Sequence, residues 1–160
     1  MSFEKIIGNE KVKTFLNKQI EENRILHSYL FVGIDGIGKT LFAKEYARKI
    51  LCIDKEENES CISCIKWKSA NHPDFYKIEP ENKTIKIEQI RQMQERISEK
   101  PITSKKKVYL IIDSDTMTKE AREIEQMIND AGLVVLPNST HYAYLERLGQ
   151  TNAIIKTFIK

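Results

Sequence analysis

The segment 33–40 has the residue types and the spacing of a loop that binds phosphate groups. It reads GIDGIGKT and matches the pattern G-x-x-x-x-G-K-[ST] at every fixed position, with an apolar run before it and a helical pattern after it. Glycines let the backbone wrap until its N–H groups point at one anion, and the positive end of the following helix adds to this attraction. We therefore predict that the loop binds ATP or ADP with Mg²⁺, the lysine reaching the phosphates and the threonine hydroxyl the metal. The residues that we expect to form this site are Gly33, Gly36, Gly38, Lys39 and Thr40.

A candidate metal-binding carboxylate follows the apolar run 108–112, which predicts a buried strand. Asp113, or Asp115 two residues later, could hold Mg²⁺ beside the phosphates. Asp115 fits a helix N-cap or a solvated turn equally well. Hydrolysis usually requires a glutamate directly after the first aspartate, to polarise the attacking water. Since Ser114 occupies that position, we expect nucleotide binding with weak or absent hydrolysis.

The elements that must position these residues alternate between short apolar runs and stretches of helical spacing. Asn9 is the expected N-cap of the first helix, and the polar residues 53–71 are expected to form a loop or a small excursion. The alternation predicts one α/β domain with a parallel sheet flanked by helices. The predicted strands are 28–32, 74–78, 108–112 and 133–136, and the predicted helices are 12–20, 41–51, 87–97, 118–130 and 153–158.

The composition is that of a single globular domain, since 41% of the 160 residues are hydrophobic and 31% are charged. The net charge of +3 gives no argument for nucleic acid. The basic run 105–107 predicts a solvated loop, with weak, salt-sensitive contact to nucleic acid as the alternative. No apolar run approaches the roughly 18 residues of a membrane span. Three cysteines, an odd number, without a secretory signal predict a reducing, cytoplasmic location.

Residues 1–121 carry several short segments in the order that is typical of one protein family. Besides the phosphate loop, these segments are IGN at 7–9, HSYLFVG at 27–33, NHPD at 71–74, IEQIR at 87–91, the strand at 107–113 and MTKEA at 117–121. They resemble the N-terminal ATPase domain of the bacterial DNA polymerase III clamp loader, in its delta-prime subunit family. The resemblance implies an AAA+ fold: a three-layer, P-loop NTPase-like parallel sheet with helices on both faces. It also implies a stator role in loading the sliding clamp, with the other clamp-loader subunits and the clamp as partners and little direct binding of DNA.

The same resemblance implies a zinc site in an excursion at 52–72, because the family carries four cysteines in this region. Asn58 stands where one of them would be, whereas structural zinc sites use four ligands. His72 is one candidate for the missing ligand, and a reduced excursion without zinc is the alternative. The candidate zinc ligands are therefore Cys52, Cys61 and Cys64.

Residues 122–160 depart from the family and resemble the C-terminal strand, histidine and helix of α/β-hydrolases, with His141 at the histidine position. No G-x-S-x-G nucleophile motif occurs in the sequence, so we expect no hydrolase activity. We interpret the chain as a chimera in which the C-terminal part of the fold is replaced by a hydrolase-like tail that supplies a strand and a helix. An engineered recombinant is the preferred origin, and a natural truncation with a divergent tail is the alternative.

Two consequences follow from this interpretation. The strand at 133–136 is expected to dock beside the strand at 108–112, whose apolar edge would otherwise be exposed. The function expected for the chain is that of a nucleotide-binding P-loop domain derived from a clamp-loader subunit. The alternative is an engineered α/β scaffold with no cellular function.

Overall fold

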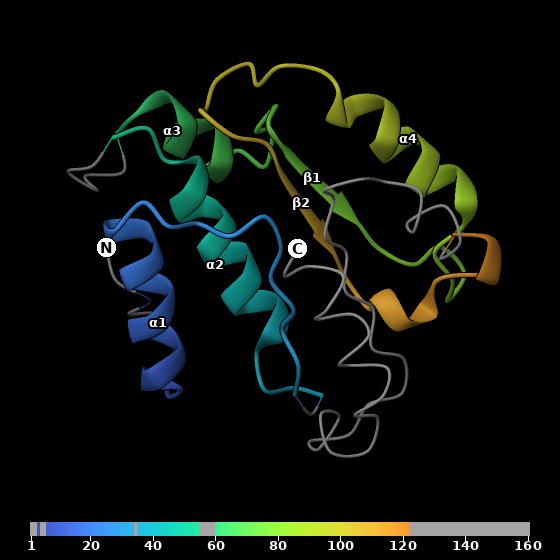
Figure 1. The fold of residues 1–160 in the computed structure, drawn as a ribbon, viewed down its shortest axis with the longest axis horizontal. Coiled ribbons are helices and arrows are strands. Elements are labelled where there is room, and N and C mark those ends of the chain that lie inside the picture. The colour runs from blue at the N-terminus through green and yellow to red at the C-terminus, as the bar shows by residue number, and fades with distance from the viewer. Residues whose placement is uncertain (1–2, 4–5, 34, 55–59, 122–160) are drawn as a thin grey trace.

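The computed structural model describes residues 3, 6–33, 35–54 and 60–121 (Figure 1). The predicted helices at 12–20, 41–51 and 87–97 and the predicted strands at 74–78 and 108–112 are confirmed. Of the predicted helix at 118–130, residues 119–121 are helical and the rest lies outside the described residues, as do the strand at 133–136 and the helix at 153–158. No helix in the described part of the chain has the length and apolar character to cross a membrane. The elements are α1 (Glu10–Glu21), α2 (Lys39–Leu51), α3 (Ile62–Lys68), β1 (Phe75–Ile78), α4 (Ile87–Ile97), β2 (Val108–Ile111) and a 3-10 helix at Ser114–Thr116.

Strands β1 and β2 are parallel, with Phe75 opposite Val108 in the register. Helix α4 connects them, because parallel neighbours require a crossover rather than a tight turn. The side chains of Tyr109 and Ile111 pack against an apolar cluster to which α4 contributes, and α2 contacts β2 as well. The described fold is thus a mixed α/β arrangement around a small parallel sheet. The complete three-layer sheet stays a prediction.

Two apolar clusters hold the helices in place. The first joins β1, α4 and the chain after β2, and the second joins the N-terminal residues to α1 and α2. Burying one large aliphatic or aromatic side chain contributes roughly 1.5–3 kcal/mol, so these clusters dominate the stability of the described part. The buried members are Ile78, Ile85, Ile90, Met93, Met117 and Ala121 in the first cluster and Phe3, Ile6, Leu16, Phe42 and Tyr46 in the second.

The strand predicted at 28–32 is wrong for the described residues, which form no ladder there. Tyr29 and Phe31 pack against the second cluster, but Leu30 and Val32 are 39% and 47% exposed. A strand needs a hydrogen-bonding neighbour, and no described strand pairs with this segment. Residues 25–33 and residues 106–115, which include β2, instead line a common cavity of about 790 Å³.

Two local predictions also need correction. The segment 53–71 contains a helix, α3, which begins after Cys61 because the Cys61 sulfur accepts the N–H of Cys64 at 3.4 Å. Asn9 does precede α1, but its side chain makes no cap bond, since its backbone is left-handed with φ of 54°. Its carbonyl oxygen accepts the N–H groups of Val12 and Lys13 instead.

Candidate functional site

The phosphate-binding loop predicted from the sequence continues into α2, whose first two residues are Lys39 and Thr40. Gly36 and Gly38 have φ of 81° and 95°, in the left-handed region that glycine adopts without strain. A Cβ atom at Gly33 would lie 3.1 Å from the Cγ2 atom of Ile37, so this glycine permits a close approach within the loop. No side chain caps α2 at Gly38, which leaves the first N–H groups of the helix facing the loop. These features of Gly33, Gly36 and Gly38 are the ones that a phosphate-binding loop needs.

The lysine of the loop folds back over the loop. The Nζ atom of Lys39 donates to the carbonyl oxygen of Gly33 at 2.8 Å and to the Oδ1 atom of Asp35 at 3.2 Å. Its side chain is 28% exposed, so the ammonium group is partly shielded yet within reach of a ligand. Thr40, the next residue of α2, is half-buried.

The predicted metal-binding aspartate lies directly after β2. Asp113 has a left-handed backbone with φ of 50°, and its carbonyl oxygen accepts the N–H and the hydroxyl of Thr116. Its side chain makes no cap bond and is exposed. Asp113, Asp115, Lys39 and Thr40 line the same cavity. The fold thus brings the loop and the acidic end of β2, which are more than seventy residues apart in the sequence, to one cavity.

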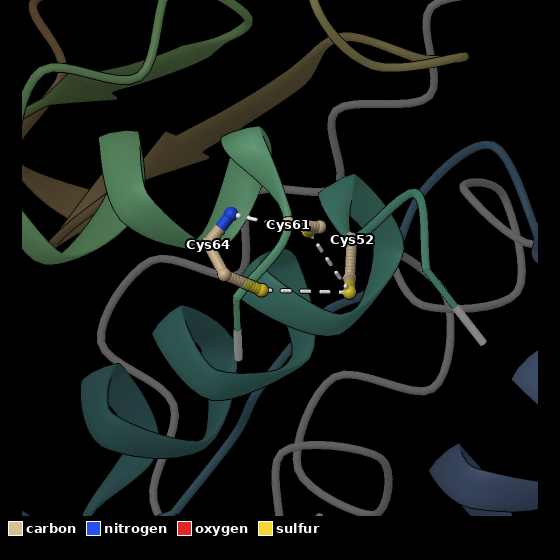
Figure 2. A group of neighbouring side chains, drawn as sticks. All are labelled: Cys52, Cys61 and Cys64. Atoms are coloured by element: carbon tan, nitrogen blue, oxygen red, sulfur yellow. Dashed lines mark hydrogen bonds between the residues drawn. The ribbon is translucent and has the colours of Figure 1, made fainter. Parts of the chain in front are cut away.

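The three cysteines come together where α2 ends and α3 begins (Figure 2). Cys52 follows the last residue of α2, Cys61 precedes α3, and Cys64 lies in the first turn of α3. The sulfur of Cys52 lies 3.8 Å from that of Cys61 and 3.5 Å from that of Cys64, and the three sulfurs lie within 4.8 Å of one another. Zinc–sulfur bonds of about 2.3 Å in a tetrahedron place sulfurs about 3.8 Å apart, so the cluster has the dimensions of three zinc ligands.

The environment of the thiols favours a thiolate at Cys61. Burial would raise the pKa of Cys61, but hydrogen bonds from the backbone and thiol of Cys64 and from the backbone of Ile53 outweigh it and lower the pKa to about 7. Burial and the hydrogen bonds to Cys61 and Cys52 raise the pKa of Cys64 to about 12. Cys61 therefore ionises more readily than Cys64, and a cation such as Zn²⁺ would favour the thiolate form of both.

His72, considered from the sequence as a fourth zinc ligand, makes hydrogen bonds to other residues. It is 7% exposed, and its Nε2 atom lies 2.8 Å from the Oγ atom of Ser63. Its Nδ1 atom accepts the N–H of Asp74 at 3.1 Å. Since both ring nitrogens have partners, His72 does not complete the cysteine cluster. Asn58, which stands where the family's remaining cysteine would be, lies outside the described residues.

The site residues that the sequence brought forward lie within the span of one known family. The sequence model of the family described as "DNA polymerase III, delta subunit" matches residues 8–124. The chain belongs to this family. The membership confirms the resemblance to a DNA polymerase III clamp-loader subunit that residues 1–121 carry. The match ends at residue 124, so the hydrolase-like tail at 122–160, the role of His141 and the chimeric origin stay predictions.

Relatives of known name agree with the DNA polymerase III family. DNA polymerase III subunit delta' of Bacillus subtilis is 38% identical over 113 residues, which are 69% of this chain and 34% of that protein. DNA polymerase III subunit gamma/tau of Mycoplasma genitalium is 32% identical over 124 residues, which are 76% of this chain and 21% of that protein. Subunit tau/gamma of Haemophilus influenzae is 29% identical over 123 residues, 75% of this chain and 18% of that protein. The chain thus spans about a third or less of the length of these relatives.

A buried polar network beside the cysteines escaped the sequence analysis of this family member. The carboxylate of Asp74, which is 0% exposed, accepts the N–H groups of residues 102, 103 and 104 at 2.6, 2.7 and 2.7 Å. The hydroxyls of Ser63 and Ser104 each donate to the carbonyl oxygen of Leu51 at 2.6 Å. The network ties α3 and the end of α2 to the chain that enters β2. The NHPD segment at 71–74 is the only sequence signal, and it gives no partners.

Proposed function

We propose that this chain is the nucleotide-binding domain of a DNA polymerase III clamp-loader subunit. It binds ATP or ADP with Mg²⁺ at the loop 33–40 and acts together with other subunits of that assembly. The observation that carries the proposal is the common cavity, because it holds Lys39 and Thr40 of the loop together with Asp113 at the end of β2. A lysine for the phosphates, a hydroxyl and a carboxylate for the metal are the side chains that a P-loop site requires.

The residues of this site favour binding of a nucleotide over its hydrolysis. Thr40 and Asp113 would hold Mg²⁺, and the metal would neutralise charge on the phosphates. Ser114 follows Asp113, and its hydroxyl is far too weak a base to activate water at neutral pH. The proposal is therefore a domain that binds nucleotide and hydrolyses it weakly or not at all, as a stator subunit would.

A zinc ion in the cysteine cluster is the second component of the proposal. The sulfur separations fit three zinc–thiolate bonds, and the lowered pKa of Cys61 favours the thiolate that a cation needs. Cys52, Cys61 and Cys64 would hold the ion, and a water molecule would fill the fourth position. A site with three protein ligands and one water exchanges its metal more readily than a four-thiolate site.

The nucleotide-binding proposal is tested by thermal unfolding with and without Mg²⁺ and ADP. A ligand at a hundred times its Kd stabilises the native state by about 2.7 kcal/mol, which raises the Tm of a domain of this size by roughly 5–10 °C. Lys39→Ala should keep the fold and lose this rise, whereas Lys11→Ala, an exposed lysine of α1, should keep it. Cooperative melting of the unsubstituted chain with no response to ADP would instead support the scaffold without a cellular function.

A further inference from the structure

The phosphate-binding loop contains a carboxylate as well as its lysine. Asp35 is the third residue of the loop, and its Oδ1 atom lies 3.2 Å from the Nζ atom of Lys39. The Asp35 side chain is fully exposed, whereas the Lys39 side chain is 28% exposed. The same ammonium group also donates to the carbonyl oxygen of Gly33 at 2.8 Å. In this structure Asp35 thus forms an ion pair with the ammonium group that a phosphate group would need to contact.

The ion pair between Asp35 and Lys39 affects how strongly the loop attracts an anion. Residues 33–40 contain one aspartate and one lysine, so their formal side-chain charge is zero. Attraction for an anion then comes from the N–H groups of the loop and the start of α2, while the Asp35 carboxylate repels it. An exposed pair of this kind is weak, so an incoming phosphate group can displace Asp35 from Lys39. The cost of displacement and repulsion grows with the negative charge on the ligand.

We propose that Asp35 sets the charge selectivity of the loop by competing with phosphate groups for Lys39. The inference rests on the proposed nucleotide binding and adds a specificity-determining residue to it. Asp35 lowers the affinity most for metal-free ATP, which is the most highly charged ligand, and less for metal-free ADP. It lowers the affinity least when Mg²⁺ already neutralises part of the phosphate charge. The loop therefore discriminates in favour of nucleotide that arrives as its magnesium complex.

A role for Asp35 as a metal ligand would have the opposite effect on nucleotide affinity. If its carboxylate bound Mg²⁺, removal of the charge would weaken the binding of the magnesium complex rather than strengthen the binding of the free nucleotide. The geometry points to competition, because the carboxylate is turned toward the Lys39 ammonium and Asp113 supplies a metal-binding carboxylate from the end of β2.

The test measures the Kd of the full chain for ATP, ADP and inorganic pyrophosphate by titration calorimetry, each with Mg²⁺ and with a chelator. Asp35→Asn should tighten the binding of metal-free ATP about five-fold at low salt, that of ADP less, and that of either magnesium complex by no more than about two-fold. These gains should shrink at high ionic strength because salt screens the repulsion. Asp35→Glu, which keeps the charge, should behave as the unsubstituted chain.

Controls separate this inference from the function on which it rests. Glu95→Gln removes one exposed carboxylate from α4 and should leave every Kd unchanged. If the unsubstituted chain binds nucleotide and Asp35→Asn has the same affinities, the inference is wrong and the proposed function stands. Weaker binding of the magnesium complex by Asp35→Asn also overturns it, in favour of a metal ligand. If both folded proteins bind none of the three ligands, the proposed function and the inference fall together.

Discussion

The Nε2 atom of His72 lies 2.8 Å from the Oγ atom of Ser63, and this bond links the chain that enters β1 to the helix that carries Cys64. Because the Ser63 hydroxyl donates to the carbonyl oxygen of Leu51, it accepts from His72, so Nε2 carries the proton. Nδ1 then accepts the N–H of Asp74 with its lone pair. The neutral form of His72 is the one that fits.

The first prediction concerns the stability of the fold at acidic pH. Burial lowers the pKa of His72, and the positive Lys66 acts in the same direction, while the negative Asp74 opposes it. The unfolded chain therefore binds a proton more readily than the native state, and stability falls as the pH drops below about 6.5, by at most about 1.4 kcal/mol per pH unit. Urea denaturation from pH 7.5 to 5 measures the loss.

His72→Gln is the matched variant, since it removes the titrating group and keeps a donor that can reach Ser63. Its stability should be lower at pH 7.5 but flat between pH 6.5 and 5. An equal slope in both proteins would contradict the account. The loss that comes from Asp74 appears only at lower pH, because three backbone N–H groups outweigh its burial and hold its pKa below the usual value of a carboxyl group.

The second prediction concerns the buried carboxylate itself. Asp74→Asn should destabilise the fold by about 3 kcal/mol, because an amide nitrogen would replace an oxygen that accepts backbone N–H groups. The free energy of unfolding in urea gives the size of the effect. Glu95→Gln, an exposed carboxylate of α4, should change it by less than about 0.5 kcal/mol. Equal stabilities of Asp74→Asn and the unsubstituted chain would show that Asp74 does not hold the loop before β2.

The features that the sequence predicted correctly are those with local causes. The glycine-rich loop and the helix that follows it are predicted from neighbouring residues, as are the spacing of α4 and the apolar run of β2. Features that depend on distant partners were missed. The bonds of Asp74 reach residues 102–104, and α3 depends on Cys61 and on the contact of Ser63 with His72.

The error at 28–32 has the same cause. An apolar run is enough to predict a buried, extended segment, but a strand exists only with a hydrogen-bonded partner. Tyr29 and Phe31 pack against the apolar core as a buried strand would. The backbone of this segment, however, has no hydrogen-bonded strand partner among the described residues. No pattern within 28–32 carries that information.

The third prediction concerns that missing neighbour. We propose that the strand predicted at 133–136 fills the part of the cavity between 28–32 and β2, and that the part at Lys39, Thr40 and Asp113 stays open for the nucleotide. In a parallel pair alternate residues bond to one side, so Tyr109 and Ile111 direct backbone groups to the edge of β2 opposite β1, where no described strand pairs. Val135→Asp should then cost at least about 3 kcal/mol of stability, and Thr151→Asp much less. Equal Tm values for the two variants would contradict the proposal.

The fourth prediction concerns the cysteine cluster. Asn58→Cys should complete a four-thiolate site and raise the affinity for Zn²⁺ by more than about 100-fold, since a protein ligand replaces water. Competition with a chromophoric chelator measures the affinity, and Cys61→Ser in the same background should abolish the gain. If Asn58→Cys binds Zn²⁺ no more tightly than the unsubstituted chain, the three thiols are not preorganised for zinc.

The measurement that tests the central claim most directly is a calorimetric titration of Mg²⁺-ADP into the full chain and into Lys39→Ala. The account predicts saturable binding of one nucleotide per chain, and a Kd at least about 100-fold weaker for Lys39→Ala, because the ammonium that meets the phosphates is gone. Both proteins should show the same cooperative unfolding without ligand. Identical titration curves for the two proteins, with or without binding, would contradict a nucleotide site at the loop 33–40.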